Sequence, residues 1–253
     1  MIQIKNSEQL ALMKQAGQIT GEALLFIRDK VRAGVSTYEL DRLIRQFIEK
    51  HGAKPSFLNY SGFPASACIS INDEVIHGIG RDDVVLKEDD IVSIDLGIKL
   101  DGALADTALT FGFHEQPADI KRLLDGTRNA LMEGIAAARC GAFIHDISAA
   151  VEKCARRHKL AIVRDFVGHG CGIQLHEPPQ IPNYTGTGRG PRLEPGMVLC
   201  IEPMLNLGTE SVKVDRKDKW TVRTRDGAWS AHFEHMILIT ENEPEILTWQ
   251  KTM

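Results

Sequence analysis

Residues 91–111 read IVSIDLGIKLDGALADTALTF, and this stretch decides the fold. Two apolar, β-like runs flank Asp101-Gly102, and an Asp-Gly pair in that setting is the strongest short signal for a two-residue hairpin turn. If these two residues form the turn, Asp95 faces Ala108, and Asp106 lies on the same face of the hairpin as Asp95. The stretch therefore predicts an antiparallel hairpin that carries two carboxylates on one side.

The two carboxylates of this hairpin are flanked by apolar residues on both strands. Ionised carboxylates in apolar surroundings repel each other and are costly to remove from water. One interpretation is that a cation lies between Asp95 and Asp106. The other is that this side of the hairpin faces solvent, and the hairpin alone leaves both open.

On either side of the hairpin, the chain alternates between helical and β-like segments. Apolar residues recur at helical spacing in four segments, 8–31, 36–51, 118–139 and 145–158. The second of these begins with Ser36-Thr-Tyr-Glu39, which has the spacing of a capping box. Short β-like runs occupy residues 67–71, 91–100, 103–113, 197–201 and 233–240. The pattern predicts a mixed protein of helices followed by strands.

An internal repeat appears when the chain is aligned with itself at an offset of about 107 residues. The stretch LKEDDIVSIDLG, from Leu86, then meets LEPGMVLCIEPM, from Leu193, and Asp95 meets Glu202. The same offset aligns two helical segments with two others. We therefore expect one catalytic domain over residues 1–253, built from two similar halves with the site between them.

Other polar residues lie at the ends of apolar strands or in a glycine-rich loop. His169 sits in Val-Gly-His-Gly-Cys-Gly, Glu202 follows the apolar run 197–201, and Glu234 precedes Met-Ile-Leu-Ile-Thr. Each alone would be read as a structural residue. Together with Asp95 and Asp106 they make four acids and one imidazole, a set that suits two divalent ions of Mn, Fe, Co or Zn.

Five stretches together make the chain resemble the type I methionine aminopeptidases: CISINDEVIHGIG (68–80), DLGIKLDGALADTALTF (95–111), GHGCGIQLHEPP (168–179), LEPGMVLCIEPM (193–204) and SAHFEHMILIT (230–240). The resemblance covers nearly the whole chain and implies the α+β pita-bread fold. In that fold an antiparallel sheet is covered by two pairs of helices, with pseudo-twofold symmetry and the site between the halves. The implied function is removal of the initiator methionine from nascent proteins when the second residue is small.

The resemblance also assigns roles to individual residues. It implies two divalent metal ions (Co, Mn, Fe or Zn) held by Asp95, Asp106, His169, Glu202 and Glu234, with Asp106 and Glu234 bridging. Glu202 would in addition take a proton from the attacking water, His176 would stabilise the developing oxyanion, and His77 would orient the peptide.

A pocket for the methionine side chain is implied as well, because such a pocket needs an apolar, polarisable lining. The resemblance draws this lining from Phe57, Tyr60, Phe63, Cys68, Leu175 and Trp220. The chain departs from the commoner family pattern at Phe57, Ser61 and Leu175, where many members have Cys, His and a larger aromatic residue. These departures bear on the fit of the pocket and so on the preference for the second residue.

Composition and charge limit the partners and the location of the protein. The chain is 43% hydrophobic and 25% charged, with a formal net charge of -4 and no dense run of Lys or Arg. These values favour neither nucleic-acid nor membrane binding. The five cysteines are scattered without a CxxC pair, and the N-terminus lacks an apolar signal region. We expect a cytoplasmic monomer that acts on nascent polypeptide N-termini, with transient ribosome association implied by that substrate.

Three other kinds of enzyme and a non-catalytic binding module remain as alternatives. An Xaa-Pro dipeptidase shares the fold and ligands but usually carries an extra N-terminal domain, as does a creatine-type amidinohydrolase. A type II methionine aminopeptidase has a helical insertion between the stretches that carry His176 and Glu202, which lie close together here. A binding module of this fold that has lost catalysis would lack several of the five ligands. All five are present in this chain.

Overall fold

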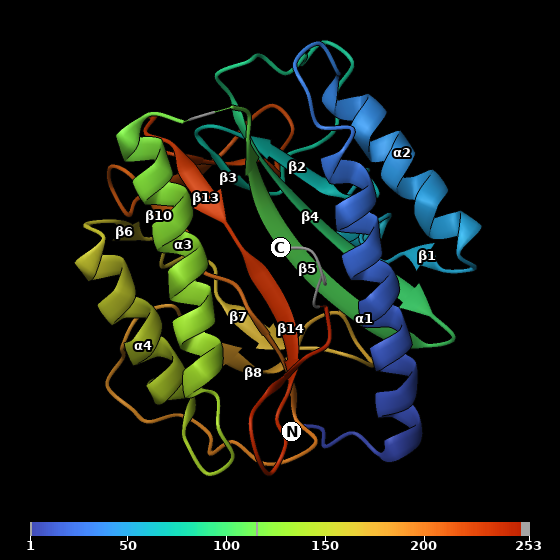
Figure 1. Ribbon diagram of the computed structural model, residues 1–253, viewed down its shortest axis with the longest axis vertical. Helices are drawn as coiled ribbons and strands as arrows, with labels where there is room; N and C mark the ends of the chain where they lie inside the picture. Colours follow the sequence, from blue (N-terminus) through green and yellow to red (C-terminus); the bar gives the residue numbers. More distant parts are fainter. Residues whose placement is uncertain (1, 115, 249–253) are drawn as a thin grey trace.

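The computed structural model describes residues 2–114 and 116–248. Its four helices are α1 (Ser7–Arg28), α2 (Thr37–Lys50), α3 (Ala118–Ala137) and α4 (Ile144–Arg157). Figure 1 shows α1 with α2 along one half of a central sheet and α3 with α4 along the other half. Of the helices in the described ranges, none combines the length and apolar character of a membrane-spanning segment.

The helix boundaries follow from local capping groups. Asn6 caps α1 by accepting a hydrogen bond from the backbone N–H of Gln9, whose side chain in turn accepts one from the N–H of Asn6. The helix ends at Arg28, three residues before the end that periodicity predicts, because the chain turns at Asp29. In α2, Ser36 accepts a hydrogen bond from the N–H of Glu39, which is one half of the predicted capping box.

The predicted hairpin is formed by β4 (Ile91–Leu100) and β5 (Ala103–Gly112). Asp95 pairs with Ala108, and Asp106 pairs with Gly97, so the predicted register is correct. Asp101 and Gly102 both have positive φ, 48° and 92°, as a type I′ turn requires. Because side chains alternate along a strand, the two carboxylates emerge from the same face of the sheet.

The hairpin is part of a nine-stranded sheet within the described residues. Its path runs β1 (Lys54–Pro55), β4, β5, β14 (Glu234–Leu238), β9 (Val198–Ile201), β7 (Gly168–Gly170) and β8 (Glu177–Ile181); β2 (Cys68–Ile71) pairs with β4, and β15 (Glu245–Ile246) with β14. One small sheet contains β13 (Ser230–His232), β10 (Met204–Asn206) and β6 (Ala161–Ile162). The other small sheet contains β11 (Val212–Val214), β12 (Val222–Thr224) and β3 (Glu74–Ile76). A short 3-10 helix spans Tyr60–Gly62.

Backbone hydrogen bonds recur between the two halves at the offset seen in the sequence. The N–H of Gly34 donates to the carbonyl of Leu86, and the N–H of Gly141 donates to the carbonyl of Leu193. Both glycines have positive φ, 87° and 85°, and each begins the turn into the second helix of its half. The antiparallel pairing of Ser36 with Val85 likewise recurs as Phe143 with Arg192. Each half therefore contains the same helix pair joined to its strand.

The core separates the helices from the acidic face of the sheet. Ile94 and Ile201, equivalent positions in the two halves, are fully buried with the helices' apolar residues in one continuous core. Burial of one such side chain contributes about 2–3 kcal/mol. The next residue along the chain in each half, Asp95 or Glu202, points to the opposite face and lines the cavity. The same alternation that builds the core thus directs two carboxylates away from it.

A buried ion pair ties the N-terminal segment to Glu177, the first residue of β8. The Lys5 ammonium donates to the Glu177 carboxylate, and both side chains are only 2% exposed. The same carboxylate accepts the backbone N–H groups of Ile173 and Gln174 at 2.7 and 2.8 Å. Burial alone would raise the pKa of Glu177, but these hydrogen bonds lower it below its ordinary value. The loop that carries Leu175 and His176 is therefore held in one conformation.

Candidate active site

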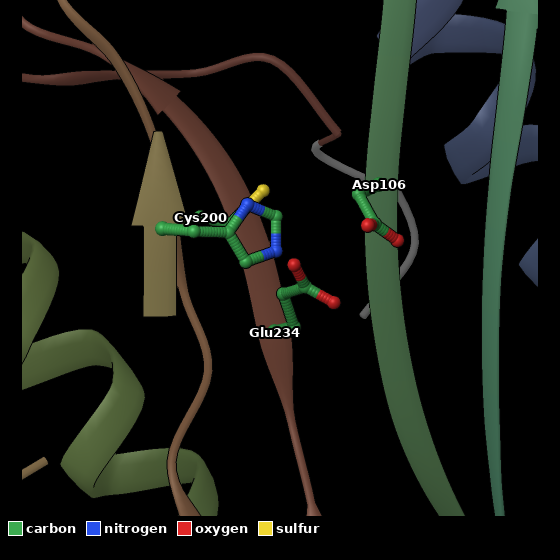
Figure 2. Close-up of side chains that lie close together, drawn as sticks. Asp106, Cys200 and Glu234 are labelled. Carbon is green, nitrogen blue, oxygen red and sulfur yellow. The ribbon is translucent and has the colours of Figure 1, made fainter. Parts of the chain in front are cut away.

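The five predicted metal ligands converge on one face of the main sheet. Asp95 and Asp106 come from the hairpin, and Glu234 on β14 pairs with Ala108, which also pairs with Asp95. Figure 2 shows the carboxylates of Asp106 and Glu234 pointing into the same space from β5 and β14. His169 on β7 and Glu202, immediately after β9, complete the group from the other side. Residues far apart in the chain thus lie together because five strands, β4, β5, β14, β9 and β7, are neighbours in the sheet.

His169 faces Glu202 in an arrangement that calls for a cation. The Nδ1 atom of His169 lies 2.9 Å from the carbonyl oxygen of Gly170, which can only accept, so Nδ1 carries the proton. The Nε2 atom is then a bare lone pair, and it lies 3.4 Å from Oε1 of Glu202. Two acceptors at this separation repel unless a positive charge lies near both. An imidazole fixed in this tautomer by a backbone carbonyl is typical of a metal ligand.

Buried oxygens without partners give a second sign of a missing positive charge. Oδ1 of Asp95, Oδ1 of Asp106 and Oε1 of Glu234 are inaccessible and accept no hydrogen bond from any residue in the described ranges. Leaving such oxygens unsatisfied is expensive in a folded protein. Divalent cations bound at this cluster would satisfy all three.

The pKa values of the cluster show how strongly it repels its own charge. Burial, together with the neighbouring charge of Asp106, raises the pKa values of Asp95, Glu202 and Glu234 well above their ordinary range. Burial raises the pKa of Asp106 to about 7. Burial also lowers the pKa of His169 to about 4, so its imidazole is neutral at pH 7 and available as a ligand.

One cluster of donor atoms is compact enough for a single ion. Ligand atoms of Asp106, His169, Cys200 and Glu234 all lie within 4.8 Å of one another, and all four residues are buried. Figure 2 places the Cys200 side chain behind this group, beside Glu234. Burial raises the pKa of the Cys200 thiol well above its ordinary value, so without a metal it stays protonated. The carboxylates and the imidazole are the donors that fit divalent ions such as Mn, Fe, Co or Zn.

A cavity of about 390 Å³ opens onto the acidic face. All six predicted pocket residues line it, Phe57, Tyr60, Phe63, Cys68, Leu175 and Trp220, together with Ser61, both predicted catalytic histidines and the five acid and imidazole ligands. Four of the six, Phe57, Phe63, Cys68 and Leu175, form a buried apolar cluster against which Trp220 packs. The structure therefore joins an apolar compartment directly to the acidic cluster.

His77 and His176 lie on the walls of this cavity. His77 has a positive φ of 59°, a conformation that residues other than glycine rarely adopt and that often marks a functional position. Its ring packs edge-on against Phe166 and Trp220, with centroids 5.6 and 6.3 Å apart. Burial lowers the pKa of His77 to about 4, with a smaller contribution from His176, so the ring is neutral at pH 7.

Several residues that line the cavity were not predicted from the sequence. His232 is almost completely buried, and its Nε2 lies 3.7 Å from Oε2 of Glu202. Asp165, Phe166, Val167 and Ile76 also line the cavity. Cys200 belongs to the compact donor cluster and was also not predicted, although a signal was present: it precedes Glu202 by two residues in an extended stretch and so shares its face. The segment 165–167 carries no such signal, since it is a loop that reaches the site through the fold.

Comparison with known proteins shows the family of the chain. Residues 11–241 match the model of metallopeptidase family M24. Over 98% of its length the chain is 47% identical to a methionine aminopeptidase of Clostridium perfringens, and the match covers 99% of that protein. The chain belongs to the methionine aminopeptidases of family M24. The crystal structure of methionine aminopeptidase from Rickettsia prowazekii agrees, with a TM-score of 0.95 at 42% identity over 98% of this chain and 100% of that one.

More distant structures share only the fold of this methionine aminopeptidase. An Xaa-Pro dipeptidase from Bacillus anthracis gives a TM-score of 0.78 at 21% identity, and the match spans 99% of this chain but 63% of that one. The predicted family, the pita-bread α+β fold class and the metallo-aminopeptidase class are thereby confirmed. The roles of individual residues remain predictions that rest on the geometry above.

Proposed function

We propose that this methionine aminopeptidase removes the initiator methionine from nascent proteins whose second residue is small. The single observation that carries the proposal is the union of the apolar compartment with the acidic cluster in one cavity. A methionine side chain fits the apolar compartment. The peptide bond that follows this methionine then lies at the acidic cluster. The family to which the chain belongs supports the same conclusion.

We further propose that Asp95, Asp106, His169, Glu202 and Glu234 would hold two divalent ions, of Co, Mn, Fe or Zn. The buried unpaired oxygens and the bare Nε2 of His169 support this assignment. When bound, such ions would supply an acidified water and a Lewis acid at the scissile carbonyl.

The protein's own groups perform the remaining tasks. Glu202, whose pKa is raised by burial, accepts the proton of the attacking water. His176 donates a hydrogen bond to the oxygen of the carbonyl as negative charge develops there. His77 hydrogen-bonds the substrate backbone and holds the peptide bond in place.

The proposed methionine pocket is formed by Phe57, Tyr60, Phe63, Cys68, Leu175 and Trp220. The whole chain is proposed to act as one catalytic domain. The proposed setting is the cytoplasm, where nascent N-termini are the substrates and transient contact with the ribosome would bring them near. The proposal includes a monomeric enzyme with no nucleic-acid or membrane partner. The modest net charge of -4 is compatible with this setting.

A panel of peptides tests the substrate proposal. We expect the metal-loaded enzyme to cleave Met-Ala-Ser at least about a hundredfold faster than Leu-Ala-Ser, Ala-Ala-Ser or an Xaa-Pro peptide, measured as the kcat/KM for release of the first residue. Met-Trp-Ser and acetyl-Met-Ala-Ser serve as controls for the second residue and for the free α-amine, and both should be poor substrates. Preferred cleavage of the Xaa-Pro peptide would move the protein to the dipeptidase alternative.

A further inference from the structure

Tyr60 reaches across the mouth of the cavity to His176. Its hydroxyl oxygen lies 2.8 Å from Nδ1 of His176, and the two ring centroids are 5.3 Å apart. The residues are separated by 116 positions in the sequence, so the fold alone brings them together. The ring of His176 also packs edge-on against His169, with centroids 4.4 Å apart. The imidazole is thus held between a hydroxyl on one side and another ring on the other.

The turn that carries Tyr60 is unusual in its backbone. Asn59, Ser61 and Gly62 all have positive φ, 66°, 50° and 89°. Residues with a side chain seldom adopt this conformation, and such strain is typical of positions that serve function. The turn closes on itself, because the N–H of Asn59 donates to the carbonyl of Phe63 and the N–H of Phe63 donates to the carbonyl of Tyr60. The turn therefore holds Tyr60 in a fixed position, although the residue is 41% exposed.

The contact has a chemical consequence for the two ring nitrogens of His176. A neutral imidazole carries a proton on one ring nitrogen and a lone pair on the other. If the Tyr60 hydroxyl donates to Nδ1, the proton of His176 must lie on Nε2. Among the described residues none hydrogen-bonds Nε2, so that N–H is available to a substrate oxygen. With the opposite tautomer, Nε2 would be a lone pair and would repel the same oxygen.

We propose that Tyr60 is a positioning residue that fixes the tautomer and orientation of His176 so that Nε2–H points at the oxygen of the scissile bond. The inference rests on the proposed function, since it assigns how His176 performs the role given to it there. It adds to the pocket-lining role of Tyr60, because the ring bounds the apolar compartment and the hydroxyl acts through His176. The two roles are separable by removing the hydroxyl alone.

The substitution Tyr60→Phe keeps the ring and deletes the hydroxyl. We expect kcat on Met-Ala-Ser to fall about tenfold, the effect of one lost hydrogen bond, while KM changes less than about twofold because the apolar wall is intact. Tyr38→Phe is the matched control, since Tyr38 is a similarly exposed tyrosine on α2, 47% accessible, and lines no part of the cavity. It should match the wild type.

A double-mutant cycle separates action through His176 from any other effect. His176→Ala alone should lower kcat by about a hundredfold or more. In that background, Tyr60→Phe should have no further effect, because there is no imidazole left to orient. If the two losses multiply, Tyr60 acts independently of His176 and the inference is wrong. If Tyr60→Phe has wild-type kcat while His176→Ala does not, the inference is wrong and the proposed function stands.

A spectroscopic measurement tests the tautomer without any turnover or metal. In protein labelled with ¹³C and ¹⁵N histidine, the ring shifts of His176 report which nitrogen carries the proton, and His176→Ala assigns the signal among the nine histidines. We expect the wild type to show Nε2 protonated and Nδ1 accepting a hydrogen bond, and Tyr60→Phe to lose the hydrogen-bonded Nδ1 shift. A proton on Nδ1 in the wild type would overturn the inference, whatever the activity of the enzyme.

Discussion

Replacement of Glu202 by alanine is expected to lower kcat for methionine release by about 10³-fold or more. General-base catalysis alone contributes about 10²–10⁴-fold, and the same carboxylate is proposed to hold a metal ion. Its Oε1 lies 3.4 Å from Nε2 of His169, so its removal also leaves that imidazole without its partner ligand. The measurement is the initial rate on Met-Ala-Ser at saturating substrate and metal.

The control for Glu202→Ala is Glu210→Ala. The side chain of Glu210 is 54% exposed and pairs with Arg164 at the surface, away from the cavity, so its loss should leave kcat unchanged. Circular dichroism of each variant would show that the protein is folded. A folded Glu202→Ala enzyme that retains more than about a tenth of wild-type kcat would contradict the role assigned to this carboxylate.

Replacement of Asp106 by asparagine is expected to abolish stabilisation by metal. Asp106 is proposed to be a metal ligand, and its strand lies between the strands of Asp95 and Glu234. A ligand present at about a thousand times its dissociation constant stabilises a folded protein by about 4 kcal/mol. The wild type should show a gain of this order on addition of Mn²⁺ in urea unfolding. The variant should gain less than about 1 kcal/mol, and an equal gain would exclude Asp106 as a metal ligand.

Without metal, the same substitution should have the opposite effect and should stabilise the fold at neutral pH. The pKa of Asp106 is raised from 3.8 to about 7 by burial, so the folded wild type binds this proton more tightly than the unfolded chain does. The wild type therefore loses stability relative to Asp106→Asn as the pH rises from about 4 through about 7. A shift of this size corresponds to a difference on the order of 2–4 kcal/mol above pH 7.

The difference between the two proteins is the quantity to measure, because total stability has a competing contribution. His77, His169 and His232 have pKa values lowered by burial, so each destabilises the folded state as the pH falls below about 6.5. These histidines are present in both proteins, and their contribution largely cancels. Chelator-treated samples that show no difference between pH 5 and pH 8 would contradict the charge repulsion inferred at the cluster.

Local signals in the sequence were sufficient for the hairpin and the repeat. The Asp101-Gly102 turn fixes the register, and the register places Asp95 and Asp106 on one face. The offset between the halves predicts that Asp95 and Glu202 are equivalent, and the recurring hydrogen bonds of Gly34 and Gly141 agree. These features depend on turn chemistry and on side-chain alternation, which act between near neighbours in the chain.

The contacts that the sequence did not predict join distant segments. Lys5 and Glu177 are 172 residues apart, and Tyr60 and His176 are 116 apart. His232 reaches the site from a small separate sheet, where it pairs with Met204. No periodicity or turn signal predicts such contacts, because they form only when the two halves and their connecting loops pack together. The resemblance to a family supplied the pocket residues, whereas the arrangement around His176 required the structure.

The most direct test of the central claim is the dependence of methionine release on metal. The purified protein is stripped with a chelator, and free methionine from Met-Ala-Ser is measured before and after Mn²⁺, Co²⁺, Fe²⁺ or Zn²⁺ is restored. We expect no release of methionine by the stripped protein. Activity should recover on addition of at least one of these metals and should saturate near two ions per chain. Undiminished release by a folded protein shown to contain no metal would contradict it.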